Sequence, residues 1–323
     1  MKVFKRLLLM IMLLLLVGVA FFMLLNYKFE QYYVLSKKVE FVLPKGSGLN
    51  QTANILEKKG VIEDARLFVL YARLNKIADR LKAGEYEISG SVSIETIAKM
   101  LVDGKVVVRS ITIPEGKALV EIIEIVKNNP YLSGEISLKL KEGEILPETY
   151  HFVRGESRDS ILNKARQSMK KVLKEEFLAR DKSIPINSEE EMLILASIVE
   201  KETGVPSERA KVASVFINRL NIGMRLQTDP TVIYAVTNGQ MNLGRPIYKR
   251  DLVYDSPYNT YVYAGLPPAP ICSPGKDAIR AVAHPDKTKF LYFVADGVTG
   301  GHRFAKTLAE HNNNVILYRR AIK

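Results

Sequence analysis

The sequence predicts an α+β protein: an N-terminal transmembrane helix, then a small α+β module, then a mixed α/β domain. Three observations lead to this class. The chain has 323 residues, 47% of them hydrophobic and 25% charged, which is enough for two domains with cores of their own. An uncharged apolar run opens the chain. After it, segments with helical periodicity alternate with short strand-like segments.

Residues 7–25 form the apolar run, nineteen residues without a charge. At about 1.5 Å per residue, such a helix spans a hydrocarbon core of roughly 30 Å. Lys2, Lys5 and Arg6 precede it, so the positive-inside rule predicts that residues 1–6 are a cytoplasmic tail. A cleaved signal peptide is the alternative, but its apolar region is normally shorter and ends in an A-x-A site. We expect a single-pass anchor in the cytoplasmic (inner) membrane, with the body outside it or in the periplasm.

Residues 39–115 are predicted to form the small module. Alternation and helical periodicity assign strand, turn and helix to 39–60, helices to 63–81 and 93–104, and strands to 82–89 and 105–116. Ser93 and Thr96 match part of a capping box at the start of the last helix, and Gly104 ends it.

Residues 116–323 are predicted to form the larger domain. A helix is expected near 117–128, and a long amphipathic one near 158–179. A capping box at 188–191 opens a further helix, which Gly204 and Pro206 end. Beyond it, 223–323 is predicted as short apolar strands and loops, with a helix after Lys306.

Charge and cysteine content narrow the function classes. The net charge is +12, but the excess of Lys and Arg is spread over the whole chain. No recognised nucleic-acid module accompanies it, so an anionic membrane surface or acidic polymer is at least as good a partner. The single cysteine, Cys272, excludes an intrachain disulfide and a thiolate metal cluster. We expect Cys272 to be a small buried residue.

Two acids at the end of the helix after Ser188 are the candidate chemistry. At about 100° per residue, Glu202 lies within the apolar stripe of Leu195 and Val199, whereas Glu200 lies to one side. Burial and the negative end of the helix dipole both disfavour a charged carboxyl there, so we expect a raised pKa for Glu202. A protonated carboxylic acid near neutral pH is what a general acid requires. We expect Glu200 to be a surface or hydrogen-bonding residue, and a structural role for Glu208.

Other enzyme classes have weaker support in the sequence. The four histidines lack H-x-x-x-H or H-E-x-x-H spacing, so no metal site is predicted at His151, His284, His302 or His311. A Ser-His-Asp hydrolase is disfavoured because no G-x-S-x-G nucleophile elbow is present.

Seven blocks of sequence resemble one known family. They are LPETYHF, ASIVEKET, ASVFINRL, GMRLQTDPTVIYA, SPYNTYVYAGLPPAPICSPG, AVAHPDKTKFLYFVADG and GHRFAKTLAEHN, and they cover most of 146–312 in order. This set resembles the endolytic murein transglycosylases, the YceG-like proteins usually called MltG. The module at 39–115 more loosely resembles the LysM-like sugar-binding domain of that family, and 116–323 resembles its catalytic domain.

The resemblance implies a lytic transglycosylase acting on nascent peptidoglycan. The family's catalytic glutamate is the second Glu of the E-K-E-T block, which is Glu202 here. It implies cleavage within glycan strands, 1,6-anhydro ends and control of strand length, with no metal or cofactor. Peptidoglycan strands, the membrane and cell-wall synthases are the implied partners, and nucleic acid is not. Polar residues suited to a sugar cleft are Gln227, Thr228, Asp229, Tyr258 and Asn259.

Two alternatives remain open from the residues alone. A hydrolytic muramidase needs a second carboxylate or a positioned water, and Asp229 is the candidate carboxylate. A non-catalytic, membrane-anchored glycan-binding scaffold would keep its activity after substitution of Glu202. For Asp229 and Asn259, turn formation is the simpler explanation.

Overall fold

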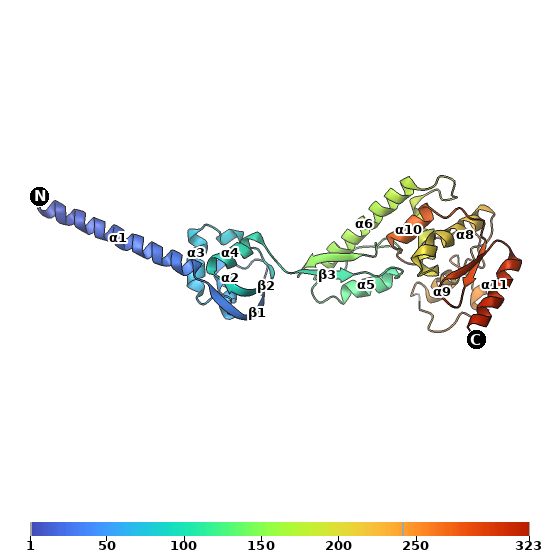
Figure 1. Cartoon of the computed structure of the whole chain (residues 1–323), viewed down its shortest axis with the longest axis horizontal. Helices are drawn as coiled ribbons and strands as arrows, with labels where there is room; N and C mark the ends of the chain where they lie inside the picture. The colour runs from blue at the N-terminus through green and yellow to red at the C-terminus, as the bar shows by residue number, and fades with distance from the viewer. Residues whose placement is uncertain (1, 241, 323) are drawn as a thin grey trace. The chain divides into compact units, whose positions relative to one another are not determined.

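The computed structural model describes residues 2–240 and 242–322 (Figure 1). The fold is mixed α+β, as predicted. The chain divides into two compact units: an N-terminal unit of residues 1–109 with 153–155, and a C-terminal unit of residues 110–152 with 156–323.

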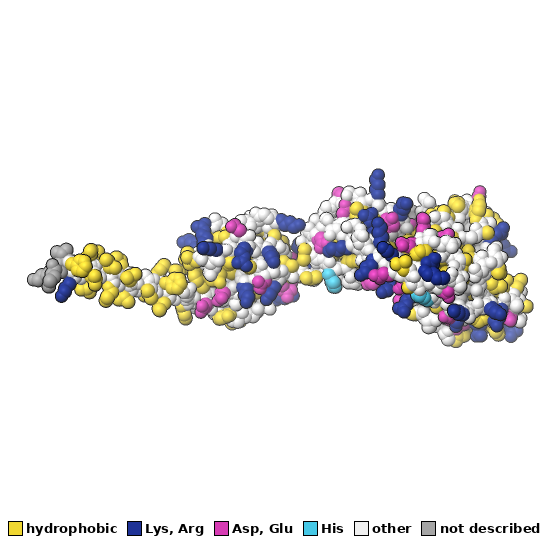
Figure 2. All heavy atoms as spheres, turned by 90° about the horizontal axis from the view of Figure 1, so that it is seen from above, with side chains coloured by type: hydrophobic (Ala, Val, Ile, Leu, Met, Phe, Trp, Pro, Cys, Tyr) yellow, Lys and Arg dark blue, Asp and Glu magenta, His cyan; other side chains and the backbone are white. Residues whose placement is uncertain are grey.

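The N-terminal unit begins with one long helix, α1 (Lys2–Glu30). Its Phe4–Glu30 portion is long and apolar enough to cross a membrane, and Figure 2 shows hydrophobic side chains along it. The helix extends past the predicted span of 7–25 because its last turn packs onto the module. There the buried Phe29 ring meets Tyr71 edge-on, with 5.1 Å between ring centroids.

The module after α1 packs three helices against an antiparallel strand pair. The strands are β1 (Tyr33–Leu43) and β2 (Gly84–Val92), paired with Phe41 opposite Tyr86. The helices are α2 (Leu49–Lys58), α3 (Ala65–Leu74) and α4 (Ile94–Asp103). The capping box at the start of α4 is complete, and Gly104 ends the helix in the left-handed conformation.

One predicted helix of this module is shorter than expected. The sequence predicted a helix over 63–81, but α3 ends at Leu74. Lys76 then adopts a positive φ of 54°, and only a 3₁₀ turn, η1 (Ala78–Arg80), follows. A left-handed residue breaks the α-helical hydrogen-bond pattern, so apolar periodicity alone overestimated the length of the helix.

The C-terminal unit contains two hydrophobic cores. Strands β3 (Val108–Thr112) and β4 (Thr149–Val153) pair with each other. The first core includes residues of these strands, of α5 (Leu119–Lys127) and of the start of α6 (Arg158–Ala179). The second core surrounds α7 (Glu189–Glu202), which contacts α6, α8 (Arg209–Asn221), α9 (Asp229–Thr237) and α10 (Lys276–Ala283). The predicted helix at 158–179 is confirmed in α6.

The prediction of only strands and loops between residue 223 and Lys306 is wrong at α9 and α10. The Asp229-Pro230 pair was interpreted as a turn, but Pro is also favoured in the first turn of a helix, and here it starts α9. The only strands described there are β5 (Tyr292–Ala295) and β6 (His302–Ala305), an antiparallel pair next to the predicted last helix, α11 (Leu308–Ala321). Two further 3₁₀ turns are η2 (Pro206–Glu208) and η3 (Asp251–Val253).

Candidate active site

Glu202 is the last residue of a helix that is buried on nearly every side. Ser188 caps α7 by accepting a hydrogen bond from the backbone N–H of Glu191, as predicted. Every residue from Met192 to Val199 is buried, because helices pack around α7. Thr203 is in an extended conformation and ends the helix. The Glu202 carboxyl is therefore held at a fixed position where the buried helix emerges.

The Glu202 carboxyl has the raised pKa that the sequence predicted. Burial is the main cause, the negative charge of Asp229 adds to it, and the pKa is raised to about 7. Three groups act in the opposite direction: the Thr228 hydroxyl, which donates a hydrogen bond to Oε1, and the positive charges of His302 and Arg219. The site therefore holds a carboxyl that can give and take a proton near neutral pH.

The turn that carries Thr228 is fixed from a second loop. Gln227 has a positive φ of 46°, and its N–H donates to the Thr260 carbonyl at 3.2 Å. The N–H of Thr228 donates to the Thr260 hydroxyl at 3.1 Å. The Thr260 hydroxyl in turn lies 2.8 Å from the hydroxyl of Thr231. Gln227 itself is exposed, whereas Thr228 is buried. This network orients the Thr228 hydroxyl toward Glu202.

Asp229 lies beside the acid as the first residue of α9. Its carboxylate is exposed and accepts a hydrogen bond from the Tyr261 hydroxyl at 2.7 Å. Asp229 is thus available to solvent and near Glu202, which fits either a substrate contact or the second carboxylate of a hydrolase.

The other two predicted contacts, Tyr258 and Asn259, differ in availability. The half-buried Tyr258 ring lies 4.8 Å from that of Tyr234. Asn259 is fully buried, and its amide nitrogen donates to the carbonyls of Leu252 and Tyr254 at 3.2 and 2.8 Å. Its side-chain oxygen accepts from the Tyr261 N–H at 3.0 Å. Asn259 therefore shapes the loop, as the turn interpretation expected.

Arg219 is a site residue that the sequence analysis missed. It is buried on α8 and donates from Nε to the Leu291 carbonyl at 2.7 Å. A short hydrogen bond from Nη1 to the Leu226 carbonyl fixes the residue just before Gln227. No helical or capping pattern marked this arginine, because its partners lie outside α8 and Leu291 is 72 residues away.

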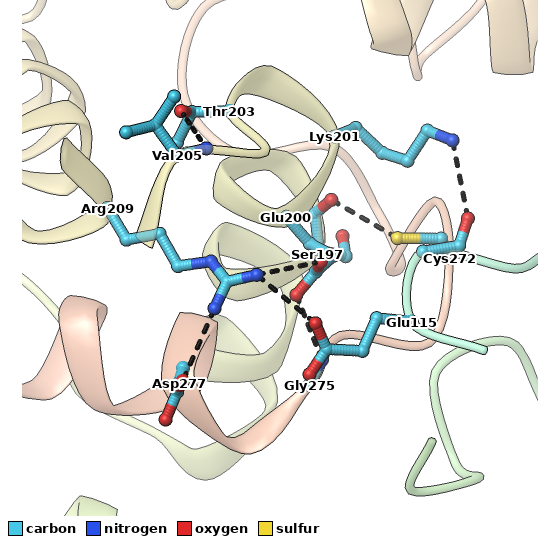
Figure 3. Close-up of polar contacts among 11 residues, drawn as sticks. Glu115, Ser197, Glu200, Lys201, Thr203, Val205, Arg209, Cys272, Gly275 and Asp277 are labelled. Atoms are coloured by element: carbon cyan, nitrogen blue, oxygen red, sulfur yellow. Dashed lines mark hydrogen bonds and ion pairs between the residues drawn. The ribbon is translucent and has the colours of Figure 1, made fainter. Parts of the chain in front are cut away.

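Glu200 is buried in a cluster of charges beside the end of α7 (Figure 3). Its side chain is 6% exposed, and Oε2 accepts from the Gly275 N–H at 3.0 Å. Arg209 lies 3.6 Å from Glu200 and also pairs with Glu115 at 3.1 Å and Asp277 at 3.4 Å. Of the two roles expected for Glu200, hydrogen bonding is confirmed and surface exposure is wrong.

Figure 3 also shows how α7 is attached to the loop before α10. The Ser197 hydroxyl accepts from the Ile271 N–H at 3.0 Å, and the Cys272 thiol lies 3.3 Å from the Ser197 carbonyl. Cys272 is fully buried, as predicted, and burial raises the pKa of its thiol. These contacts lock the last turns of α7 and thus the direction of Glu202.

Glu142 is another carboxyl with a raised pKa, and the sequence analysis also missed it. Burial raises its pKa to about 7. It accepts a hydrogen bond from the N–H of Leu119, the first residue of α5, at 2.9 Å and lines a pocket of about 250 Å³. The contact with a helix N-terminus gives Glu142 a capping role. Across residues 2–240 and 242–322, no group of three or more potential metal-ligating side chains is brought together.

Comparison with known proteins places this chain in a family. The sequence profile of the YceG-like family matches residues 41–316. This chain belongs to the YceG-like family. It is 33% identical over 305 residues to a protein of Bacillus subtilis (strain 168) named endolytic murein transglycosylase, covering 85% of this chain and 83% of that one.

Two further proteins of this family are similar to the chain. A protein of Streptococcus pneumoniae serotype 2 (strain D39 / NCTC 7466) with the same name is 31% identical over 327 residues, and the match covers 86% of this chain but only 58% of the streptococcal one. A crystal structure of a putative yceG-like protein from Listeria monocytogenes aligns with a TM-score of 0.52 at 33% identity. That alignment covers 86% of this chain and 99% of the Listeria chain.

Proposed function

We propose that this YceG-like protein is a membrane-anchored lytic transglycosylase that cuts bonds between N-acetylmuramic acid (MurNAc) and N-acetylglucosamine (GlcNAc) within peptidoglycan strands. The enzyme class is that of its relatives, which are named endolytic murein transglycosylases. The observation that carries the chemistry is the Glu202 carboxyl, whose pKa is raised to about 7 and which is oriented by Thr228.

In the first step, protonated Glu202 acts as a general acid. It donates its proton to the oxygen of the MurNAc–GlcNAc bond, and the C–O bond at the MurNAc anomeric carbon breaks. The Thr228 hydroxyl and the positive charge of Arg219 favour the carboxylate that remains. A carboxyl with a pKa of about 7 loses its proton far more readily than it would with only its burial acting.

In the second step, the same carboxylate acts as the base. The MurNAc 6-hydroxyl attacks the anomeric carbon, and Glu202 takes the hydroxyl proton. This regenerates the acid and leaves a 1,6-anhydro-MurNAc end. Water is not consumed, so one carboxyl suffices where a glycoside hydrolase normally uses two.

Substrate contacts are assigned by exposure. Exposed Gln227 and Asp229 flank the buried Thr228 beside the acid, and Tyr258 offers an aromatic face. We assign sugar contacts to Gln227, Asp229 and Tyr258. Thr228 contributes by orienting the acid, and Asn259 by holding the loop.

The anchor explains where the enzyme acts. With 1–6 in the cytoplasm and 7–25 in the inner membrane, the module at 39–115 and the catalytic domain at 116–323 lie outside it. Tethering raises the effective concentration of the enzyme where new strands emerge. Cleavage there limits strand length. We also propose that the module binds glycan in the manner of a LysM domain and that the protein associates with cell-wall synthases.

The test is mass spectrometry of purified peptidoglycan strands digested with wild type, Glu202→Gln and Glu175→Gln, the last altering an exposed glutamate of α6. We expect 1,6-anhydro-MurNAc ends from wild type and Glu175→Gln, and none from Glu202→Gln. Reducing ends from wild type would instead indicate a hydrolytic muramidase using Asp229. New ends from none of the folded proteins would indicate a glycan-binding scaffold.

A further inference from the structure

A carboxylate–imidazole pair, Glu208 with His302, lies outside the mechanism above. Glu208 is in η2, six residues after Glu202, and His302 begins β6. Glu208 Oε2 lies 2.7 Å from His302 Nδ1, and Oε1 accepts from the His302 backbone N–H at 3.0 Å. One carboxylate thus fixes both the backbone and the ring of the same histidine.

The surroundings of the His302 ring restrict its orientation. A Cβ atom on Gly301 would lie 2.8 Å from Glu208 Oε1, so the absence of a side chain at Gly301 leaves room for the carboxylate. The Phe293 ring meets the imidazole edge-on, with centroids 5.4 Å apart. The side chains of His302 and Glu208 are only 13% and 17% exposed. Packing and hydrogen bonding therefore both orient the imidazole.

The pairing with Glu208 occupies one of the two ring nitrogens of His302. The Glu208 carboxylate accepts the hydrogen on Nδ1, so Nε2 is the ring nitrogen left free for a ligand. The part of the chain that the structure describes places no hydrogen-bond partner on Nε2. His302 is also near enough to Glu202 for its charge to lower the pKa of that carboxyl.

We propose that His302, held by Glu208, is a substrate-orienting residue whose Nε2 forms a hydrogen bond with a hydroxyl or acetamido group of the sugar at the cut bond. The inference rests on the proposed function, because it assigns a substrate contact at the same site. Glu202 supplies the proton and takes it back, while His302 fixes the angle at which the sugar meets Glu202.

Asparagine and glutamine separate this role from a structural one. His302→Asn places an amide nitrogen near the position of Nδ1, so it keeps the bond to Glu208 but removes Nε2. His302→Gln places an amide near the position of Nε2. His151→Asn, in an exposed histidine of β4, is the matched control.

The measurements are the melting temperature and kcat/KM for release of new chain ends from peptidoglycan strands. We expect His302→Asn to keep the wild-type Tm and lose roughly 10- to 100-fold in kcat/KM, as for a misplaced substrate. His302→Gln should recover part of that loss, and His151→Asn should match wild type.

Two results would overturn the inference. One is a folded His302→Asn within about twofold of the wild-type kcat/KM. The other is a large fall in Tm for both His302→Asn and Glu208→Gln with proportional loss of activity, which marks a purely structural contact between η2 and β6. Failure of the proposed function is seen separately, as the wrong end chemistry or no cleavage by wild type.

Discussion

Replacing Thr228 with valine removes one hydrogen bond from the candidate acid and little else. The Thr228 hydroxyl donates to Glu202 Oε1, and its backbone N–H is held by the Thr260 hydroxyl at 3.1 Å. Valine carries a methyl group where threonine has its hydroxyl, and Thr228 is 2% exposed, so the volume that packs in the turn is nearly unchanged. The carboxylate of Glu202 then lacks its neutral donor.

The size of the effect follows from the value of that bond. A hydrogen bond to a charged group contributes about 1.5–3 kcal/mol, and a pKa shift of one unit corresponds to about 1.4 kcal/mol. Taking the lower end, Thr228→Val raises the pKa of Glu202 by about one unit above its present value of about 7. At pH 8, the protonated fraction then rises from about a tenth to about a half.

The assay is kcat/KM for release of 1,6-anhydro ends between pH 5 and 9. The basic limb of the profile should shift to higher pH by about one pH unit, because the protonated acid is the form that starts the reaction. The plateau should fall by roughly 10-fold, because the carboxyl is less firmly oriented. Thr149→Val, which removes an exposed hydroxyl bonded to Thr112, should change neither. A basic limb that stays in place would refute the assignment of Thr228 as a group that lowers this pKa.

Three further predictions concern stability. Because the native pKa of Glu202 is raised from 4.5 to about 7, wild type loses stability as pH rises through this range. The free energy of unfolding of Glu202→Gln, measured with urea, should therefore exceed that of wild type by about 3 kcal/mol at pH 8 and by little at pH 4.5. Arg209→Met leaves the buried Glu200 carboxylate without its cation and should cost about 3–5 kcal/mol, partly restored by adding Glu200→Gln in a double-mutant cycle. Deleting the chain through Phe29 should destabilise the N-terminal unit by about 3 kcal/mol more than a deletion that stops before it, seen as a lower Tm.

The sequence predicted what local geometry determines. Helical periodicity, the Ser188 cap and the position of Glu202 in the apolar stripe all depend on residues within a few turns of one helix. They were sufficient to predict a raised pKa before any tertiary contact was known, because burial is its main cause. Local patterns failed where composition was ambiguous, as in the Asp229-Pro230 pair that opens α9.

Contacts between distant residues were beyond the reach of any local pattern. Thr228 is 26 residues from the acid that it bonds, and Glu208 is 94 residues from His302. Glu200 was expected at the surface or in a hydrogen bond, since a glutamate near a helix end is usually solvated. It is buried because Arg209 and the Gly275 N–H satisfy its charge.

These distant contacts set the pKa on which the proposed acid and base roles of Glu202 depend. Burial alone would hold Glu202 protonated and make it a poor acid, whereas full solvation would leave it charged at neutral pH. Its pKa of about 7 is a balance of opposing effects. Burial and the charge of Asp229 raise the pKa, whereas Thr228, His302 and Arg219 lower it. The opposing groups come from α8, from β6 and from the turn before α9, so the proton affinity of Glu202 depends on how these segments pack around α7. Loss of that packing should therefore change the pH profile before it abolishes cleavage.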